Sequence, residues 1–332
     1  MACILVTGGA GYIGSHTVKL LGRDHENVVV LDNLYTGFAE SITHGTFVQG
    51  DTGDRVLLDK VLEEHDIETV LHFAAHTIVP ESVENPLKYY GNNTANTRTL
   101  LEACNDHGVK HFVFSSTAAT YGEPASGRCN EQTPTAPINP YGMSKLMSET
   151  MLRDLDAVSD MNHVILRYFN VAGSDPDGAI GQSTEKATLL IKVAAEHAVG
   201  KRDAVYIFGT DYATADGTGI RDYIHVTDLA EAHVSALRYL RDGGPSVTLN
   251  CGYGSGFSVR DVLNTVQSQV NHELNIIEKP RRAGDPPELV ADVDRIHATL
   301  DWTPRHNDLD TIVRTSIAWE RRLLQDDFRR RA

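Results

Sequence analysis

The sequence of 332 residues has few cysteines and no long apolar segment, and each shortage excludes a class of protein. Its four cysteines, at positions 3, 104, 129 and 251, are scattered and form no Cys-x-x-Cys pair, which indicates reduced packing residues of a cytoplasmic protein. No apolar run approaches the roughly 20 residues of a membrane helix. The N-terminus enters an expected strand almost at once, so we predict no signal peptide, and the lack of a long apolar run predicts no membrane partner.

Positive charge is also scarce. Thirty Lys and Arg residues against forty-five Asp and Glu residues give a formal net charge of −15, which argues against nucleic acid as a partner. The fifteen histidines show no His-Glu-x-x-His motif and no clustered ligand spacing, so we expect no metal site. A hydrophobic content of 41% is ordinary for a globular chain of one large or two moderate domains.

Glycine, by contrast, is concentrated near the N-terminus. The segment Thr7–Gly14 reads TGGAGYIG and lies between an apolar run, Ile4–Val6, and a segment with apolar residues at helical spacing. Gly8, Gly11 and Gly14 have the spacing that holds a dinucleotide pyrophosphate against the free amides and positive dipole end of a helix. The alternative is a glycine-rich turn without a ligand, so the prediction depends on the segments further along the chain.

A second expected strand, Val28–Leu31, ends at Asp32, which lies eighteen residues after Gly14. A carboxylate at this distance accepts hydrogen bonds from both ribose hydroxyls and repels a 2′-phosphate. No arginine comes directly after it, since Asn33 and Leu34 are next. We therefore predict NAD as the cofactor in preference to NADP, although a solvated strand-end Asp is the alternative for this residue alone.

The first half of the chain alternates apolar strands with helical patterns, which predicts an α/β fold built on a doubly wound parallel Rossmann sheet. The expected strands are Ile4–Val6, Val28–Leu31, Phe47–Val48, Val70–Phe73, Phe112–Phe114 and Val164–Leu166, with helices at Arg55–Glu64 and Leu87–Asn105 among others. Such sheets bind ligands beyond the carboxyl ends of their strands. Asp51 and Thr52 follow the third of these strands, and Phe73, Ala74 and Ala75 end the fourth, where the small alanines let the backbone approach a cofactor. Asn92 or Asn93 on the next helix could reach back to the same ligand.

The fifth strand leads to Thr117, and a later helix begins near Pro140 and carries Tyr141 and Lys145 on one face, four residues apart. A free phenol has a pKa of ~10, so its ionisation at pH 7 costs about 4 kcal/mol. A positive charge ~4 Å from the phenolate, such as that of Lys145, stabilises it by about the same amount at an effective dielectric constant of ~20. Tyr141 is thus a candidate general base, with Thr117 offering a hydroxyl to the same alcohol oxygen. An exposed Tyr-x-x-x-Lys on an ordinary helix is the alternative.

The second half has a different character and is expected to form a smaller α/β domain for the substrate. We predict a dinucleotide-binding domain over residues 1–170 and a discontinuous second domain over residues 171–332, with roughly 219–250 rejoining the first. A helix is expected at about Lys186–Val199 and another from Asp228 to about Leu240. Arginines at positions 221, 281 and 282 suit a diphosphate if they converge on one cleft, although solvated arginines are an equal alternative.

Together these segments resemble the UDP-galactose (UDP-glucose) 4-epimerases of the extended short-chain dehydrogenase/reductase group, over about Ile4 to Trp319. The glycine segment and Tyr-x-x-x-Lys define only the wide superfamily. The more specific segments are GTGIRDYIHVTDLA at 217–230 and RRAGDPP at 281–287. Further matching segments are LDNL at 31–34, HFAA at 72–75, FSSTAATYGEP at 114–124, NPYGMSK at 139–145 and RYFNVAG at 167–173.

The resemblance implies a UDP-sugar substrate and a reversible oxidation at C4. Tyr141, aided by Lys145, takes the C4 hydroxyl proton while hydride passes to tightly bound NAD, the 4-keto sugar turns over, and hydride returns to its other face. NAD contacts are implied for Tyr12, Ile13, Asp32, Asn33, Asp51, Thr52, Phe73, Ala74, Ala75, Asn92, Tyr141, Lys145 and Phe169. UDP contacts are implied for Asn170, Tyr206, Ile207, Phe208, Arg221, Arg282 and Asp285, with Thr117 beside the sugar. A homodimer through helices of the first domain is also implied.

Two departures from the family pattern bear on the substrate. The segment 183–193 lacks the Asn-Leu or His-Leu pair that often touches the diphosphate, and Thr188-Leu189 is the nearest candidate. Leu289 stands where some members carry a bulky tyrosine, which leaves room for an N-acetyl group, so interconversion of UDP-GlcNAc and UDP-GalNAc is an alternative activity.

Other functions of the superfamily fit less well. A nucleotide-sugar dehydratase needs an acidic pair after the strand-end Thr, where Ala118 and Ala119 stand. A hydroxysteroid oxidoreductase has no need of Arg221 and Arg282, and a non-enzymatic NAD-sensing module has no need of the Thr–Tyr–Lys set.

Overall fold

The computed structural model describes residues 3–185, 187–282 and 285–325. Its largest sheet has seven strands in the order β11-β7-β5-β4-β1-β2-β3, and every neighbouring pair in it is parallel. The strands are β1 (Cys3–Thr7), β2 (Asn27–Asp32), β3 (Thr46–Gln49), β4 (Ile67–His72), β5 (His111–Thr117), β7 (Asn162–Tyr168) and β11 (Val247–Cys251). The strand order reverses between β1 and β4, which is where doubly wound sheets bind ligands. The predicted α/β class is confirmed.

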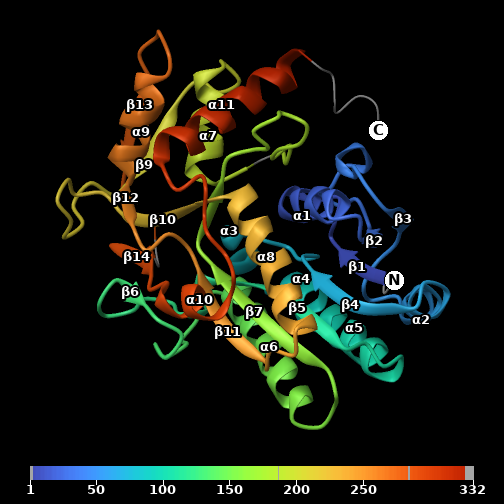
Figure 1. The fold of residues 1–332 in the computed structure, drawn as a ribbon. Helices are drawn as coiled ribbons and strands as arrows, with labels where there is room; N and C mark the ends of the chain where they lie inside the picture. The colour runs from blue at the N-terminus through green and yellow to red at the C-terminus, as the bar shows by residue number, and fades with distance from the viewer. Residues whose placement is uncertain (1–2, 186, 283–284, 326–332) are drawn as a thin grey trace.

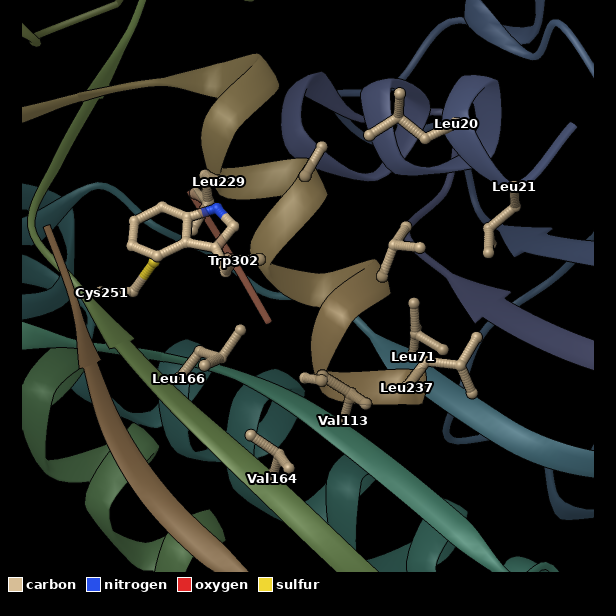
Figure 2. Close-up of a cluster of buried hydrophobic side chains, with 14 of the residues drawn as sticks. Leu20, Leu21, Leu71, Val113, Val164, Leu166, Leu229, Leu237, Cys251 and Trp302 are labelled. Atoms are coloured by element: carbon tan, nitrogen blue, oxygen red, sulfur yellow. The ribbon is translucent and has the colours of Figure 1, made fainter. Parts of the chain in front are cut away.

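Helices cover both faces of this sheet (Figure 1), so its strands are apolar on both sides. On one face α1 (Tyr12–Arg23) and α8 (Val226–Arg241) pack on residues such as Ile4 and Val6. Figure 2 shows this core, where Leu229 and Leu237 of α8 lie above the sheet. The alternate residue Leu5 faces the other layer, formed by α2 (Arg55–Glu64), α5 (Asn96–Asp106) and α6 (Pro140–Asp156).

The helix expected at Leu87–Asn105 is interrupted. The chain forms α4 (Pro86–Tyr89), then a π-helical segment η2 (Tyr90–Ala95), and then α5. In the wide π turn the side chain of Asn93 is buried, where it accepts from the His76 amide at 2.8 Å and donates to Ser144 Oγ at 3.1 Å. Local apolar spacing cannot reveal this turn, because the partners that stabilise it come from other segments.

The second half builds two smaller sheets. One has five strands in the order β12-β10-β14-β6, with β8 also pairing β10, and the other pairs β13 with β9. These strands are β6 (Arg128–Cys129), β8 (Asn170–Ala172), β9 (Val205–Phe208), β10 (Ile220–His225), β12 (Gly256–Ser258), β13 (Ile276–Lys279) and β14 (Glu288–Ala291). The flanking helices are α7 (Leu190–Ala198), α9 (Val259–Ser268), α10 (Asp294–Thr299) and α11 (Leu309–Gln325). Short helical segments elsewhere are α3 (Val79–Glu84), η1 (Ala39–Ser41) and η3 (Ala118–Thr120).

The helix expected at about Lys186–Val199 begins later, at Leu190, and residue 186 lies outside the described residues. The preceding turn is held in an irregular conformation, since the Ala187 carbonyl accepts from Arg202 at 3.1 Å. Within 219–250, β10 lies in the five-stranded sheet, whereas α8 covers the large sheet and β11 forms its edge. No helix in the described ranges has the length and apolarity to cross a bilayer.

Candidate active site

The glycine loop between β1 and α1 has the geometry of a phosphate cradle. Gly8 has φ +73°, and a Cβ on it would lie 2.6 Å from the Ala74 amide nitrogen. A Cβ on Gly14 would lie 2.3 Å from the Gly8 carbonyl oxygen, so the helix start packs directly on the turn. Gly11 is the N-cap of α1 and supplies no side chain to cap it. The first amides of α1, from Tyr12 and Ile13, are therefore available to an anionic ligand.

Asp32 lies at the end of β2 and is 8% exposed. Its carboxylate accepts from the amides of Ala10 at 2.9 Å and Leu34 at 2.8 Å, which fixes its direction next to the glycine loop. Burial raises the pKa of this carboxyl group, and the two amide bonds oppose the shift. Each oxygen keeps a second lone-pair direction, so acceptance from ribose hydroxyls is compatible with the contacts present.

The other residues expected at the cofactor lie along the same sheet edge. Asp51 accepts from Asn33 at 2.9 Å and from Asn96 at 2.7 Å, so two amide side chains orient its carboxylate. Thr52 is buried beside it. Phe73, Ala74 and Ala75 come directly after β4, and the Ala74 backbone lies against the Gly8 turn.

Asn92 and Phe169 occupy less direct positions. Asn92 donates to the neighbouring Asn93 at 3.0 Å, and it is Asn93 that is buried against His76 and Ser144. Phe169 comes directly after β7 and packs in a small apolar cluster with Ala118 and Tyr121. The ligand roles of all these residues stay predictions.

Tyr141, Lys145 and Thr117 come together where β5 ends. The start of α6 is defined by Asn139, whose side chain accepts from the Gly142 amide at 2.9 Å, and by Pro140 at the first helical position. A Cβ on Gly142 would lie 2.5 Å from the Ala119 carbonyl oxygen, so glycine lets α6 approach the end of β5. As a result Tyr141 is 7% exposed and Thr117 is 7% exposed.

Electrostatics in this group are dominated by burial. Burial raises the pKa of Tyr141, and a hydrogen bond with Thr117 lowers it. Burial also lowers the pKa of Lys145 to about 7, with the charge of Glu149 opposing. The Lys145 ammonium donates to the Ser115 carbonyl at 2.9 Å and lies 4.8 Å from the Phe114 ring centroid. A buried phenol and ammonium at one site are the parts of a proton-transfer centre.

Sequence reasoning missed the groups behind Lys145. The His233 Nδ1 atom contacts the Leu229 carbonyl at 2.8 Å and must donate there, which leaves Nε2 as an acceptor for Ser115 Oγ at 3.2 Å. Ser115 Oγ also lies within hydrogen-bond distance of the Tyr168 hydroxyl, at 3.1 Å. The His233 ring also lies 4.6 Å from the Phe73 ring. Because His233 is 118 residues from Ser115, no local pattern could reveal this chain of contacts.

A group of charged and aromatic side chains lies in the second half of the chain. Arg221 of β10 lies 3.4 Å from Asp285, and the Arg282 guanidinium lies 3.7 Å from the Phe208 ring centroid. In β9, Tyr206 is 42% exposed whereas Ile207 is buried.

The remaining substrate candidates lie on nearby elements. Asn170 opens β8, and Leu289 of β14 packs on the cluster that contains Phe169. Leu189 of the Thr188-Leu189 pair is the N-cap of α7, and its side chain is 37% exposed.

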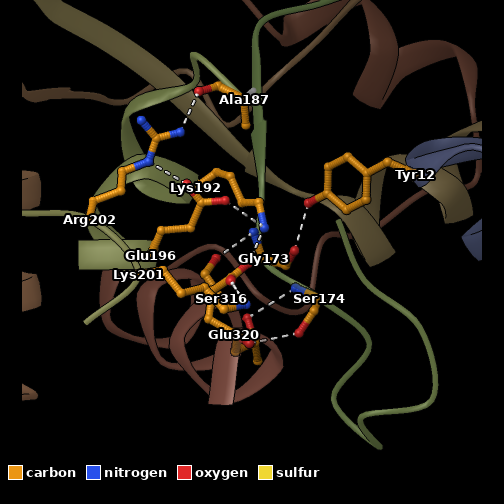
Figure 3. Close-up of polar contacts among 11 residues, drawn as sticks. Tyr12, Gly173, Ser174, Ala187, Lys192, Glu196, Lys201, Arg202, Ser316 and Glu320 are labelled. Carbon is orange, nitrogen blue, oxygen red and sulfur yellow. Dashed lines mark hydrogen bonds and ion pairs between the residues drawn. The ribbon is translucent and has the colours of Figure 1, made fainter. Parts of the chain in front are cut away.

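A network of polar contacts joins the segment after β8 and helix α11 to Tyr12, next to the glycine loop (Figure 3). The Tyr12 hydroxyl donates to the Gly173 carbonyl at 2.6 Å, and the Gly173 amide donates to Ser316 of α11 at 3.0 Å. Lys19 of α1 lies 2.6 Å from Asp175. Because its side chain makes this contact, Tyr12 is available to a cofactor through its backbone amide.

Residues 4–252 match the NAD dependent epimerase/dehydratase family, and the chain belongs to that family. The family's cofactor is the one predicted from Asp32 and the glycine loop, and the geometry of that loop accommodates it.

Within the family the similarity is to 4-epimerases of UDP-sugars. The chain is 54% identical to the UDP-glucose 4-epimerase of Azospirillum brasilense over 323 residues, which is 97% of this chain and 93% of that protein. The UDP-glucose 4-epimerase of Brucella ovis, solved in complex with NAD, is 43% identical with a TM-score of 0.93 over 96% of this chain and 98% of that one. The UDP-Glc/GlcNAc 4-epimerase of Campylobacter jejuni is 47% identical with a TM-score of 0.86 over 97% and 100% of the two chains.

Proposed function

We propose that this chain is an isomerase that interconverts UDP-galactose and UDP-glucose by inverting C4 of the sugar. The observation that carries the proposal is the buried pair of Tyr141 and Thr117, joined by a hydrogen bond at the carboxyl edge of an NAD-binding sheet, with Lys145 beside it. Similarity to UDP-glucose 4-epimerases over nearly the full chain supports the choice of substrate.

The chain's own residues supply binding and proton transfer. When bound, NAD supplies the hydride acceptor for C4. The residues proposed to hold it are Gly8, Gly11, Tyr12, Ile13, Gly14, Asp32, Asn33, Asp51, Thr52, Phe73, Ala74, Ala75, Asn92, Tyr141, Lys145 and Phe169. The Tyr141 phenolate oxygen accepts the C4 hydroxyl proton and later returns it, while Thr117 holds the same oxygen in line. Lys145 stabilises the ionised phenol, because its ammonium is held in a buried site of low dielectric constant.

The nucleotide part of the substrate is proposed to bind the charged and aromatic side chains of the second half of the chain. In an acidic protein, Arg221 and Arg282 provide positive charge where a diphosphate must bind, and Asp285 orients Arg221. Asn170 and the Tyr206–Phe208 strand are proposed to hold the uridine, with Phe208 offering an aromatic face.

The sugar preference is a second proposal. Leu289 packs beside Phe169 near the catalytic group, and a leucine there leaves more space than a tyrosine. We therefore propose that UDP-GlcNAc and UDP-GalNAc are further substrates, and the Campylobacter jejuni relative is named as a 4-epimerase of UDP-Glc and UDP-GlcNAc.

Assembly, location and domain division are also proposals. A homodimer through helices of the first domain is supported by apolar side chains at the surface, with Val83 61%, Leu87 78% and Met147 40% exposed. A cytoplasmic location is supported by four free cysteines. We divide the chain at about residue 170, with α8 and β11 returning to the first domain.

Proton NMR of the purified protein with UDP-galactose and no added NAD tests the function. Appearance of the UDP-glucose anomeric signal supports both epimerisation and tightly held cofactor. Activity only after NAD is added would remove the tight-binding claim and leave the chemistry. No product under either condition would exclude UDP-galactose, and UDP-GalNAc in the same assay tests the wider sugar pocket.

A further inference from the structure

Asp222 is a buried carboxylate that the proposed mechanism does not use. It lies in β10 between Arg221 and Tyr223 and is 0% exposed. Among the described residues it makes no ion pair within 4.0 Å. Burial raises its pKa to about 6, which the backbone amides around it oppose. A buried charge without a cation is costly, so its contacts must compensate for the loss of water.

Those contacts are three backbone amides from two other segments. Asp222 Oδ1 accepts from the Tyr253 amide at 2.9 Å, and Oδ2 accepts from the amides of Gly254 at 2.9 Å and Ala291 at 3.2 Å. The packing is close, because a Cβ on Gly252 would lie 2.6 Å from Asp222 Oδ2. The carboxylate therefore joins the turn after β11 to β14.

This position is also where β10 changes partners. Arg221 pairs with Leu289 of β14, whereas Tyr223 pairs with Asn170 of β8. The strand of the carboxylate thus carries Arg221, a proposed diphosphate ligand, and two neighbouring strands carry Leu289 of the proposed sugar site and Asn170, a proposed uridine ligand. β11 is the edge strand of the sheet proposed to bind the cofactor. The bonds from Asp222 to the turn after β11 therefore fix the position of the proposed substrate residues relative to the cofactor.

We propose that Asp222 is a positioning residue for substrate binding, which holds Arg221, Leu289 and Asn170 in the register that the UDP-sugar requires. The inference rests on the proposed function. It predicts that Asp222 acts on substrate affinity, and that cofactor binding and the proton-transfer group are independent of it.

The variant Asp222→Asn keeps the size of the side chain but points an amide donor at backbone donors. We expect KM for UDP-galactose and the calorimetric Kd for UDP to rise about tenfold, because the new amide donor faces backbone donors and displaces the strands that carry the proposed ligands. The kcat should change by less than about threefold and the bound NAD content should not change. Gly252→Ala moves the same carboxylate without removing it, and it should raise KM and Kd in the same direction even if Asp222→Asn does not fold.

Asp54→Asn is the control, because the Asp54 side chain also accepts from a backbone amide, that of Leu57 at 3.1 Å, but lies at the start of α2, away from the strands that carry the proposed substrate ligands. It should lower the melting temperature and leave KM and Kd unchanged. Unchanged KM and Kd in both Asp222→Asn and Gly252→Ala would overturn the inference, as would an equal loss of affinity in Asp54→Asn. A wild-type protein that binds UDP but epimerises no sugar would instead refute the proposed function, and the UDP titrations would still decide the role of Asp222.

Discussion

The hydroxyl of Tyr141 is the group whose removal tests the chemistry most directly. In Tyr141→Phe the ring stays buried, and the substitution removes only the hydrogen bond with Thr117. Such a bond is worth about 1 kcal/mol, so the melting temperature should fall by no more than about 3 °C. The fold and the NAD content should therefore persist.

The effect on the rate should be far larger. A phenol with its ordinary pKa of ~10 needs about 4 kcal/mol to ionise at pH 7, and burial raises that cost further. The site can offset this ionisation cost only if a positive charge lies next to the phenolate during the reaction. A correctly positioned general base typically raises the rate by a factor of about 10²–10⁴. We expect kcat to fall by about 10³, which corresponds to about 4 kcal/mol in the barrier.

Initial rates of UDP-glucose formation, measured by NMR at saturating UDP-galactose, provide the assay. Tyr89→Phe is a matched control, because the Tyr89 ring lies 6.5 Å from the Tyr141 ring and its hydroxyl donates to the Ile78 carbonyl at 2.7 Å. That variant should lose some stability and keep its kcat within a few-fold. Near-normal turnover in Tyr141→Phe, or an equal loss in Tyr89→Phe, would refute the assignment of the base.

The glycine loop, Lys145 and His306 each offer a further test. Gly14→Ala places a Cβ 2.3 Å from the Gly8 carbonyl oxygen and so distorts the glycine loop. The amount of NAD released on denaturing the purified variant should therefore drop about tenfold or more, and full NAD occupancy would contradict a phosphate-binding role for this loop. Lys145→Met should lower kcat by about 10²–10³, because one charge at ~4 Å is worth about 4 kcal/mol at an effective dielectric constant of ~20; unchanged initial rates would exclude that charge as the phenolate's partner. The pKa of His306 is raised by its hydrogen bond to Asp228, so its stabilisation is fully present below pH ~6.5 and is lost as pH rises through the raised value. Urea denaturation should therefore show that His306→Asn loses more free energy of unfolding, relative to wild type, at about pH 6 than at about pH 9. Equal losses at the two pH values would contradict a stabilising ion pair between His306 and Asp228.

The cofactor half of this protein was accessible from local patterns. Parallel strands buried on both faces must be apolar at consecutive positions, as in Val28–Leu31, and helices between them show a different period. The glycines at 8, 11 and 14 and the Tyr141–Lys145 spacing are short-range requirements of a tight turn and of one helix turn. Each needs only a few neighbouring residues to be recognised.

The substrate half was less accessible because its geometry depends on residues distant in the chain. Nothing near Asp222 in sequence shows that its carboxylate meets the amides of Gly254 and Ala291, 32 and 69 residues away. The π turn at Tyr90–Ala95 likewise depends on partners in other segments.

Local sequence was thus sufficient for the alternation of strands and helices, the dinucleotide loop and the candidate base, since each depends on the periodicity or steric needs of one segment. Long-range packing alone established that β10 leaves β14 for β8 at Asp222, and that His233 lies against Ser115 across 118 residues. These contacts form where separate segments are packed together, and a local pattern carries no record of which distant amide or hydroxyl a buried side chain will meet.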